Sequence, residues 1–375
     1  MWREHRDIYR SMTMGKKHKF AIVGAGNGGK ALAGHIATKG HHVSLFEGLE
    51  PSEAFLQLSK EKEIFLEGDI KSRGNLNRVT TSMEEAVADA DVILVVVPAF
   101  AHGPIFSKLI PLLKDGHRIV VIPGNFGSLL LRKMMHEMGI NKQVSISETA
   151  SLPYACRATS YNTVMIHKAK KALKIATYPV KANREIKDIM NTIAKIFIAG
   201  KNVLEVSLDN INCVLHPLPI LLNIGAIEKN PETFSHYLDG ITPLISEKIT
   251  RMDEERIAIG TAYSLNLIST LDQLKIYYGK NDSKGIYEYV NSTQSPYKDM
   301  IGDSLYSRYI TEDVPYVVVP TMLLGEKVGI RASLFKLCVD LASELHSKDY
   351  VESGHNLTNL GIADMGREQL LAYIS

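Results

Sequence analysis

The stretch FAIVGAGNGG, residues 20–29, decides the fold. A short apolar run is followed directly by a glycine-rich turn, and a helix-like segment continues through Leu32 and Ile36. In a G-x-G-x-x-G turn the first glycine permits a tight bend, the second lets the backbone approach a pyrophosphate, and the third lets helix and strand pack closely. The pattern therefore predicts a dinucleotide site at a helix N-terminus. Its expected contacts are Gly24, Gly26, Asn27, Gly28 and Gly29.

Around this turn, short apolar runs alternate with longer mixed segments from residue 20 to about residue 178. Runs of this kind are typical of parallel strands that crossover helices bury on both faces. The predicted strands are Phe20–Val23, Val43–Phe46, Val92–Val97, Ile119–Ile122 and Val144–Ile146, followed by a hairpin of Thr163–Ile166 and Leu173–Tyr178. We expect an α/β Rossmann domain with a doubly wound, mostly parallel sheet.

After about residue 202 the hydrophobic pattern becomes helical, and one helix is predicted over Val203–Glu228. The predicted organisation is an N-terminal tail (1–18), a Rossmann dinucleotide-binding domain (19–202) and an all-α catalytic and substrate domain (203–375). A chain of 375 residues suits two domains of about 100–200 residues each. Two domains imply a cleft, and we expect the active site there.

The composition excludes several classes of partner. The formal charge of +2 gives no long-range field that would gather nucleic acid, and no run approaches the roughly 20 apolar residues of a membrane span. The cysteines Cys156, Cys213 and Cys338 are odd in number and widely spaced, which favours reduced thiols over a disulfide framework or a metal site. We expect a cytoplasmic protein with small-molecule partners and no metal; a homodimer is compatible with these features.

The second strand ends at Glu47, about twenty residues after the glycine turn, where a carboxylate accepts hydrogen bonds from ribose hydroxyls. No arginine follows it immediately, and a carboxylate repels a 2′-phosphate, so NAD is predicted over NADP. Two later strands lead into loops that contain Pro98 and Asn125. Ligands of open α/β sheets bind outside the carboxyl ends of the strands, so these loops should line the nicotinamide and the substrate. His102 also lies here, and it is either a base or a histidine that caps the next helix or faces solvent.

A polar row, Asp209, Asn212, His216 and Asn223, runs beside the apolar stripe of the predicted helix and could line the cleft. His216 precedes a proline, which disturbs the turn before it. Functional sites are where a sequence tolerates such a conflict, yet the pattern alone leaves His216 evenly divided between a catalytic and a structural role.

The segment RYITED, residues 308–313, places an arginine and an aspartate five residues apart. The planar fork of arginine suits a substrate carboxylate, and an aspartate can orient an imidazole. The alternative is a surface pair of Arg308 with Glu312 or Asp313, which the spacing alone favours.

Three segments resemble the opine dehydrogenases: residues 202–219 with HPLP at 216–219, RYITED at 308–313, and ETASLPYACR at 148–157. The likeness covers nearly all of the chain after the tail. It implies condensation of an amino acid with a 2-oxo acid, usually pyruvate, and reduction of the imine with a nicotinamide cofactor.

The resemblance also implies roles for single residues. His216 matches the catalytic acid/base histidine, Asp313 its carboxylate partner, and Arg308 an arginine that binds substrate carboxylate. The candidates for contact with the amino acid are Asn125, Glu148 and Thr149. Cys156 matches a cysteine near the site, which we interpret as pocket lining because hydride transfer to an imine requires no thiolate.

Two alternatives stay open on the sequence. A reductase of the glycerol-3-phosphate, 6-phosphogluconate or ketopantoate type shares this architecture, but those families usually place a lysine on the helical domain, and the row beside His216 contains none. A non-catalytic NAD-sensing protein would need the cofactor motif but not His216, Asp313 and Arg308 together.

Overall fold

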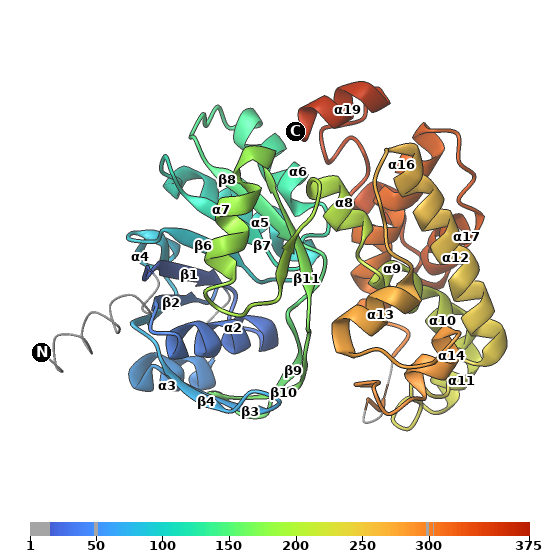
Figure 1. Ribbon diagram of the computed structural model, residues 1–375, viewed down its shortest axis with the longest axis horizontal. Helices are drawn as coiled ribbons and strands as arrows, with labels where there is room; N and C mark the ends of the chain where they lie inside the picture. Colours follow the sequence, from blue (N-terminus) through green and yellow to red (C-terminus); the bar gives the residue numbers. More distant parts are fainter. Residues whose placement is uncertain (1–15, 49–51, 298–299, 303) are drawn as a thin grey trace, which may run out of the picture.

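The computed structural model describes residues 16–48, 52–297, 300–302 and 304–375. Most of the predicted tail, residues 1–15, therefore lies outside the described residues. Figure 1 shows two halves side by side: a sheet-containing half, coloured blue to green, and a helical half, coloured yellow to red.

The core of the first half is an eight-stranded sheet. In spatial order its strands are β12 (Phe197–Ala199), β11 (Leu173–Tyr178), β8 (Ser145–Thr149), β7 (Arg118–Val121), β6 (Val92–Val95), β1 (Lys19–Val23), β2 (His42–Phe46) and β5 (Arg78–Thr80). Every neighbouring pair is parallel except β8 and β11. The strand order reverses between β1 and β6, which is the switch point where such sheets bind nucleotides. The predicted doubly wound, mostly parallel sheet is confirmed.

Burial on both faces explains the continuous apolar runs. In β1, Phe20 and Ile22 belong to one hydrophobic cluster, whereas Ala21 and Val23 belong to the cluster on the opposite face. All four residues are at most 1% exposed. The helices of this half are α2 (Asn27–Thr38), α3 (Glu53–Glu61), α4 (Met83–Val87), η1 (Ala99–Ala101), α5 (His102–Leu109), η2 (Ile110–Leu112), α6 (Gly127–Glu137), η3 (Val180–Ala182) and α7 (Asn183–Met190).

A second sheet packs against α2 on the side away from the main sheet (Figure 1). Its strands are, in order, β4 (Ser72–Asn75), β3 (Glu63–Gly68), β10 (Thr163–Ala169) and β9 (Tyr154–Ala158). The predicted hairpin of Thr163–Ile166 with Leu173–Tyr178 is wrong, because β10 pairs with β3 and β9 while β11 enters the main sheet. The intervening segment is held elsewhere: the Lys171 N–H donates to the Tyr277 carbonyl of the helical half.

The helical half contains α8 (Val203–Leu208), α9 (Asn212–Leu215), α10 (Pro217–Leu222), α11 (Ile224–Lys229), α12 (Pro243–Ala262), α13 (Thr270–Tyr278), α14 (Ile286–Val290), α15 (Arg308–Thr311), the π-helical turn η4 (Val314–Val318), α16 (Val319–Lys327), α17 (Ser333–His346), α18 (Tyr350–Ser353) and α19 (Arg367–Tyr373). The single helix predicted over Val203–Glu228 is therefore wrong: this stretch forms the four short helices α8 to α11.

Distant side chains and a proline explain these breaks. Arg256 Nη1 donates to the Leu208 carbonyl, and Gln273 Nε2 donates to the Asp209 carbonyl. A continuous helix would use these two oxygens for the amides four residues later. Pro217 occupies the first position of α10, where no amide hydrogen is needed, so a new helix starts there. His216 consequently lies in the joint between α9 and α10.

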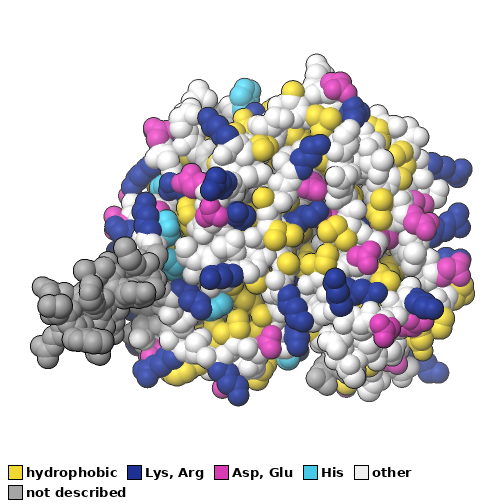
Figure 2. Space-filling view, viewed as in Figure 1, with side chains coloured by type: hydrophobic (Ala, Val, Ile, Leu, Met, Phe, Trp, Pro, Cys, Tyr) yellow, Lys and Arg dark blue, Asp and Glu magenta, His cyan; other side chains and the backbone are white. Residues whose placement is uncertain are grey.

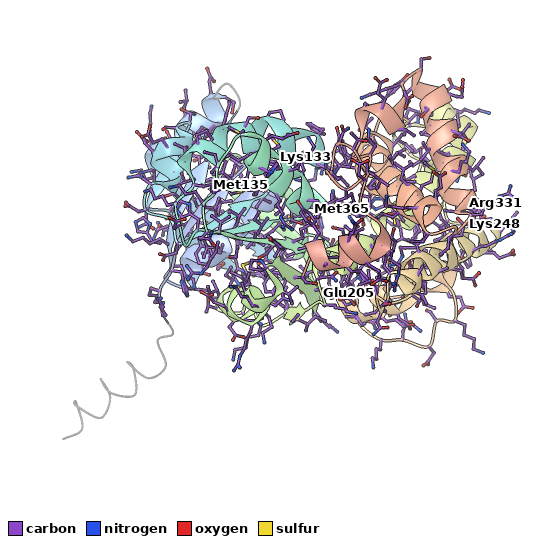
Figure 3. The ribbon with its side chains drawn as sticks, turned by 90° about the horizontal axis from the view of Figure 1, so that it is seen from above. Lys133, Met135, Glu205, Lys248, Arg331 and Met365 are labelled. Atoms are coloured by element: carbon purple, nitrogen blue, oxygen red, sulfur yellow. The ribbon has the colours of Figure 1, made fainter. Side chains whose placement is uncertain are left out.

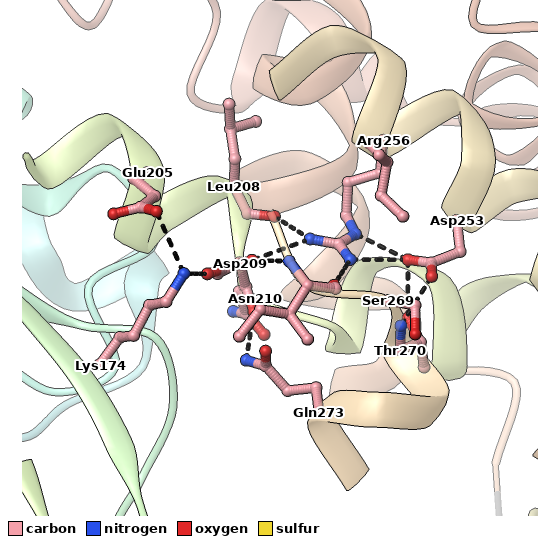
Figure 4. A network of polar contacts seen from close by, with 12 residues as sticks. Lys174, Glu205, Leu208, Asp209, Asn210, Asp253, Arg256, Ser269, Thr270 and Gln273 are labelled. Atoms are coloured by element: carbon pink, nitrogen blue, oxygen red, sulfur yellow. Dashed lines mark hydrogen bonds and ion pairs between the residues drawn. The ribbon is translucent and has the colours of Figure 1, made fainter. Parts of the chain in front are cut away.

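A buried network of charges joins the two halves (Figure 4). Lys174 on β11 contacts Glu205, at 3.1 Å, and Asp209. Arg256 on α12 contacts Asp209 at 3.3 Å and Asp253 at 2.8 Å. Asp209 was predicted to line the cleft, but it is fully buried in this network instead. The network anchors α8 and the following turn to the sheet.

The junction of the two halves is also visible from a second direction. From above, Glu205 and Met365 lie at the junction of the halves, whereas Lys248 and Arg331 lie at the outer edge of the helical half (Figure 3). Figure 2 shows basic and acidic side chains interspersed over one face, with hydrophobic side chains gathered along its middle. Among the residues that the structure describes, no helix has both the length and the apolar character needed to cross a membrane.

Candidate active site

The glycine turn has the geometry that its sequence predicts. Gly24 has a φ of +113°, and a Cβ atom there would lie 2.4 Å from the Val96 carbonyl oxygen. A Cβ on Gly29 would lie 1.8 Å from the carbonyl oxygen of Gly24, so helix and strand meet through bare backbone. A Cβ on Gly26 would meet no described atom within 4 Å. The backbone at Gly26 is therefore open to a ligand.

The N-terminus of α2 faces this opening and fits a dinucleotide pyrophosphate. Its cap residue, Gly26, provides no side-chain hydrogen bond, and the first turn contains no acidic residue. The amides of the first turn therefore keep their capacity to bind an anion, which the helix dipole favours. Asn27 is held in place because its Oδ1 accepts the Ala158 N–H at 2.9 Å. Leu152 packs over the turn, since a Cβ on Gly28 would lie 2.8 Å from its side chain.

On the adenosine side of this site, Glu47 follows β2 as expected, and its carboxylate accepts the Gly48 N–H at 2.8 Å. Lys30 on α2 lies within electrostatic reach of Glu47. Burial lowers the pKa of Lys30, and the negative charge of Glu47 opposes that shift. The region expected to hold the ribose therefore contains both a carboxylate and an ammonium group.

The loops after β6 and β7 are held by the helical half. The Ala99 N–H, next to Pro98, donates to Glu312 Oε1 at 3.0 Å. Asn125 and the residue after it adopt left-handed conformations, with φ values of +49° and +63°. Asn125 Oδ1 accepts from Asn210 at 2.7 Å, and its carbonyl contacts His355 Nδ1 at 2.8 Å. Contacts from the other half thus fix a backbone conformation that non-glycine residues rarely adopt.

A pocket of about 230 Å³ lies between the two halves. The Rossmann half lines it with Pro123, Asn125, Ser151 and Leu152, and the helical half with Asn212, His216, Arg308, Tyr309, Glu312 and Asp313. Because Pro123 and Asn125 follow β7, and Leu152 covers the glycine turn, the pocket lies at the carboxyl ends of the strands beside the dinucleotide site.

His216 and Asp313 meet at the helical wall of this pocket, although 97 residues separate them in the chain. Nδ1 of His216 lies 2.7 Å from Asp313 Oδ2, and the two residues are 8% and 6% exposed. An ionised carboxylate only accepts hydrogen bonds, so Nδ1 carries the hydrogen and Nε2 is the other reactive position. Tyr309 stacks on the imidazole, with ring centres 3.9 Å apart. Asp313 immediately precedes the π-helical turn, a feature frequent at functional sites.

Arg308 lines the same pocket and also forms the local ion pair that the spacing favoured. Its Nε lies 2.5 Å from Glu312 Oε2. The Arg308 side chain is 63% exposed, whereas that of Glu312 is 5% exposed. Burial raises the pKa of Glu312, and the positive charge of Arg308 acts against this. Glu312 therefore braces the guanidinium from the interior while the guanidinium stays accessible to a ligand.

Glu148 and Thr149 lie outside the lining of the pocket. Glu148 is fully buried, and it accepts the Ser128 N–H at 2.7 Å and the hydroxyl of Ser207. Burial raises its pKa. Thr149 donates to the Ser151 carbonyl at 2.9 Å. Both side chains support loops of the site, and neither lines the pocket, where they were expected to contact the amino acid.

His102 and Cys156 also lie away from the pocket lining. His102 is fully buried, and neither ring nitrogen has a hydrogen-bond partner among the described residues. Burial lowers the pKa of His102 to about 3, which does not suit a base. Burial also raises the pKa of Cys156 to about 11, so its thiol stays protonated.

A larger hollow, of about 610 Å³, lies at the opposite ends of β7 and β8. Its two arginines are already engaged: Arg118 with Glu185 at 2.6 Å, and Arg132 with the Tyr373 carbonyl of α19. The hollow lies at the end of the sheet away from the glycine turn, and we assign no chemistry to it.

Sequence reasoning missed several contributors to the pocket. Tyr309 and Glu312 were visible inside a motif but had no assigned role in substrate binding. Asn212, by contrast, lines the pocket as its place in the polar row predicted. Tyr237 contacts His216 from behind, at 3.0 Å from Nε2, and no pattern in the sequence distinguishes it from an ordinary buried aromatic residue.

Comparison with known proteins identifies the same two halves. The family described as NAD/NADP octopine/nopaline dehydrogenase, alpha-helical domain, matches residues 199–346. The N-terminal family of NAD-dependent glycerol-3-phosphate dehydrogenase matches residues 19–145. The second match covers only the cofactor half, whereas the first covers His216, Arg308 and Asp313.

Full-length relatives extend this likeness. The opine dehydrogenase of Arthrobacter sp. (strain 1C) is 34% identical over 350 residues, which cover 92% of this chain and 96% of the relative. The solved structure of octopine dehydrogenase with NADH and L-arginine shares the fold, with a TM-score of 0.77, 19% identity, and coverage of 96% of this chain and 99% of that one. Yersinopine dehydrogenase with NADP⁺ bound has a TM-score of 0.72, 14% identity, and coverage of 96% and 98%. The chain belongs to the opine dehydrogenase family and is an NAD(P)-dependent oxidoreductase.

Proposed function

We propose that this enzyme condenses an amino acid with a 2-oxo acid, pyruvate being the first candidate, and reduces the resulting imine with NADH. The observation that carries the proposal is the pocket between the halves, where the His216–Asp313 pair and Arg308 face the loops beside the glycine turn. When bound, NADH supplies the hydride that reduces the imine carbon.

Arg308 is the proposed anchor for the carboxylate of the 2-oxo acid. A guanidinium binds a carboxylate through charge-assisted, often bidentate hydrogen bonds. Its brace, Glu312, also accepts the Ala99 N–H of the loop after β6. The guanidinium that binds the 2-oxo acid would therefore be held by a carboxylate that contacts both halves of the molecule.

His216 is the proposed acid and base. The amino group adds to the carbonyl carbon, and loss of water from this adduct requires a proton on the departing hydroxyl, which an imidazolium can supply. Asp313 keeps the imidazole oriented and stabilises its protonated form.

We further propose a donor amino acid with an uncharged side chain. Both carboxylates that line the pocket are already committed, Asp313 to His216 and Glu312 to Arg308 and the Ala99 amide. Apart from His216 and Arg308, the remaining polar residues of the wall are uncharged: Asn125, Ser151, Asn212 and Tyr309. A cationic side chain would enter without a carboxylate to pair with it.

The test follows NADH oxidation with pyruvate against each amino acid in turn, with ketopantoate and dihydroxyacetone phosphate in parallel. We expect turnover with pyruvate plus neutral amino acids, and kcat/KM at least about tenfold lower with arginine or lysine. Turnover with ketopantoate or dihydroxyacetone phosphate alone would contradict the proposal. NADH binding without any turnover would favour a cofactor-binding role.

We propose NAD as the preferred cofactor, with NADP less favoured. Glu47→Ala should lower the ratio of kcat/KM for NADH to that for NADPH by about tenfold, the scale of one lost hydrogen bond together with relieved charge repulsion. Glu53→Ala, an exposed carboxylate at the start of α3, is the matched control and should leave the ratio unchanged. An unchanged ratio in Glu47→Ala would reassign the ribose contact.

A further inference from the structure

Both ring nitrogens of His216 have partners in the structure. Oδ2 of Asp313 lies 2.7 Å from Nδ1, and the hydroxyl of Tyr237 lies 3.0 Å from Nε2. Tyr237 is 3% exposed and is not part of the pocket lining. The nitrogen that is available for proton exchange therefore contacts a buried phenol behind the pocket wall.

Tyr237 is held rigidly in a cluster of aromatic rings. It stacks on Tyr297, with ring centres 3.8 Å apart and planes at 9°. Burial raises the pKa of Tyr237 well above its ordinary value, and the neighbouring Tyr309 raises it further. Tyr237 is therefore a neutral phenol that can both donate and accept a hydrogen bond.

Tyr309 connects this cluster to the pocket. It lines the pocket and stacks on the imidazole of His216. The Tyr237 hydroxyl thus contacts His216 Nε2, and the Tyr237 ring lies next to that of Tyr309 at the pocket wall, with ring centres 6.5 Å apart.

We propose that Tyr237 is a positioning residue for the condensation reaction: its hydroxyl holds Nε2 of His216 and relays the exchanged proton to Tyr309 at the pocket wall. The inference rests on the proposed function. When the substrate hydroxyl leaves as water, Tyr309 gives it a proton and receives one from Tyr237. Tyr237 in turn receives the Nε2 proton of the imidazolium. His216 loses one proton in all, and both tyrosines are neutral before and after.

The test compares Tyr237→Phe with Tyr297→Phe, since each variant removes one hydroxyl from one of two stacked, buried rings. We expect kcat to fall at least about tenfold in Tyr237→Phe, within the range of general acid–base effects, and less than about threefold in Tyr297→Phe. The second kinetic readout is the dependence of kcat on the deuterium fraction of the solvent. It should be curved in the wild type, because several protons move together, and linear in Tyr237→Phe. A purely structural role would not change this curvature.

A readout without turnover separates this inference from the proposed function. In the whole protein with ¹⁵N-labelled histidine, the Nε2 resonance of His216 should shift in Tyr237→Phe and not in Tyr297→Phe. If it shifts while the wild type turns over no amino acid with pyruvate, the proposed function fails and the positioning contact stands.

Equal kcat values and equal solvent-isotope curves in the two variants would overturn the relay. Should Tyr237→Phe fail to fold, Tyr309→Phe removes the last hydroxyl of the proposed relay, at the pocket wall. This variant should show the same tenfold loss of kcat and a linear dependence of kcat on the deuterium fraction. Curved dependence with near-normal kcat in Tyr309→Phe would also overturn the relay.

Discussion

Arg308 shows how one side chain serves two partners. The buried carboxylate of Glu312 holds the guanidinium from one side, and most of the Arg308 side chain is exposed. A braced arginine loses less conformational freedom when it binds a ligand than a free one would. The ion pair and the substrate site are therefore compatible.

Arg308→Met should raise KM for the 2-oxo acid at least about tenfold, because a charge-assisted hydrogen bond contributes about 1.5–3 kcal/mol. Steady-state kinetics at saturating amino acid measure this effect. Arg331→Met, which removes an exposed arginine at the outer edge of the helical half, is the control and should leave KM unchanged (Figure 3). A change in thermal stability alone would mean that Arg308 serves only its pair with Glu312.

The glycine turn could be predicted residue by residue, because the local backbone geometry of the turn requires each glycine. The pocket could not be predicted in this way. Spacing in the sequence cannot show that His216 and Asp313 meet, so their pairing was implied only by the resemblance. Glu148 and Thr149 lie on the strand that leads into the pocket, but their side chains are buried beneath the loops that form it. The direction in which these side chains point depends on how the two halves pack. Tyr237 gives no sequence signal because its role comes from one contact across the fold.

The joint between α9 and α10 is the element that presents His216. It forms because Pro217 starts α10 directly after His216. The preceding break, between α8 and α9, is the one that Arg256 and Gln273 impose from α12 and α13. Hydrophobic periodicity indicates the apolar face of a helix. It does not indicate that a distant side chain will donate a hydrogen bond to one of the carbonyl oxygens and so end the helix. The continuous helix over Val203–Glu228 was therefore predicted from a real pattern and was still wrong. The predicted hairpin failed similarly, since the pairing of β10 and β11 depends on strands far away in the sequence.

Arg256→Met should lower the free energy of unfolding by about 3–5 kcal/mol, because it leaves Asp209 and Asp253 buried with less counter-charge. Denaturant unfolding measures the change. Lys248→Met, at a partly exposed position of the same helix, should lower the free energy of unfolding by at most about 0.5 kcal/mol. Equal unfolding midpoints for the two variants would mean that the network contributes little to stability.

At the scale of the whole molecule, several histidines are buried in the uncharged form. Burial lowers the pKa of His102 to about 3, and the pKa values of His35 and His355 to about 4. In the unfolded chain a histidine titrates near 6.5. Between these values the unfolded chain binds more protons than the folded one, so stability falls as the pH drops from about 6.5 towards about 4.

His102→Leu should reduce the loss of unfolding free energy between pH 7 and pH 5 by about 2 kcal/mol relative to the wild type. Denaturant unfolding at the two pH values measures this difference. His42→Leu, at an exposed position, should leave it unchanged. If His102→Leu and the wild type lose the same stability on acidification, His102 is not the source of the acid sensitivity.

The division of the molecule into two halves was the most predictable feature, because strand-like and helical periodicity occupy different parts of the chain. The contacts that join the halves, from Lys174 to Asp209 and from Glu312 to Ala99, were not predictable, since each pairs residues that are remote in the sequence. These contacts place the helical wall of the pocket against the loops of the sheet.

In the proposed mechanism the two halves have separate tasks: the sheet half binds the cofactor, and the helical half exchanges the proton. The most direct test measures NADH binding by fluorescence and turnover by absorbance in His216→Asn. We expect a Kd for NADH within about threefold of the wild type and a kcat lower by at least about a hundredfold. Turnover close to that of the wild type, with NADH binding intact, would mean that His216 is not the acid and base of the reaction.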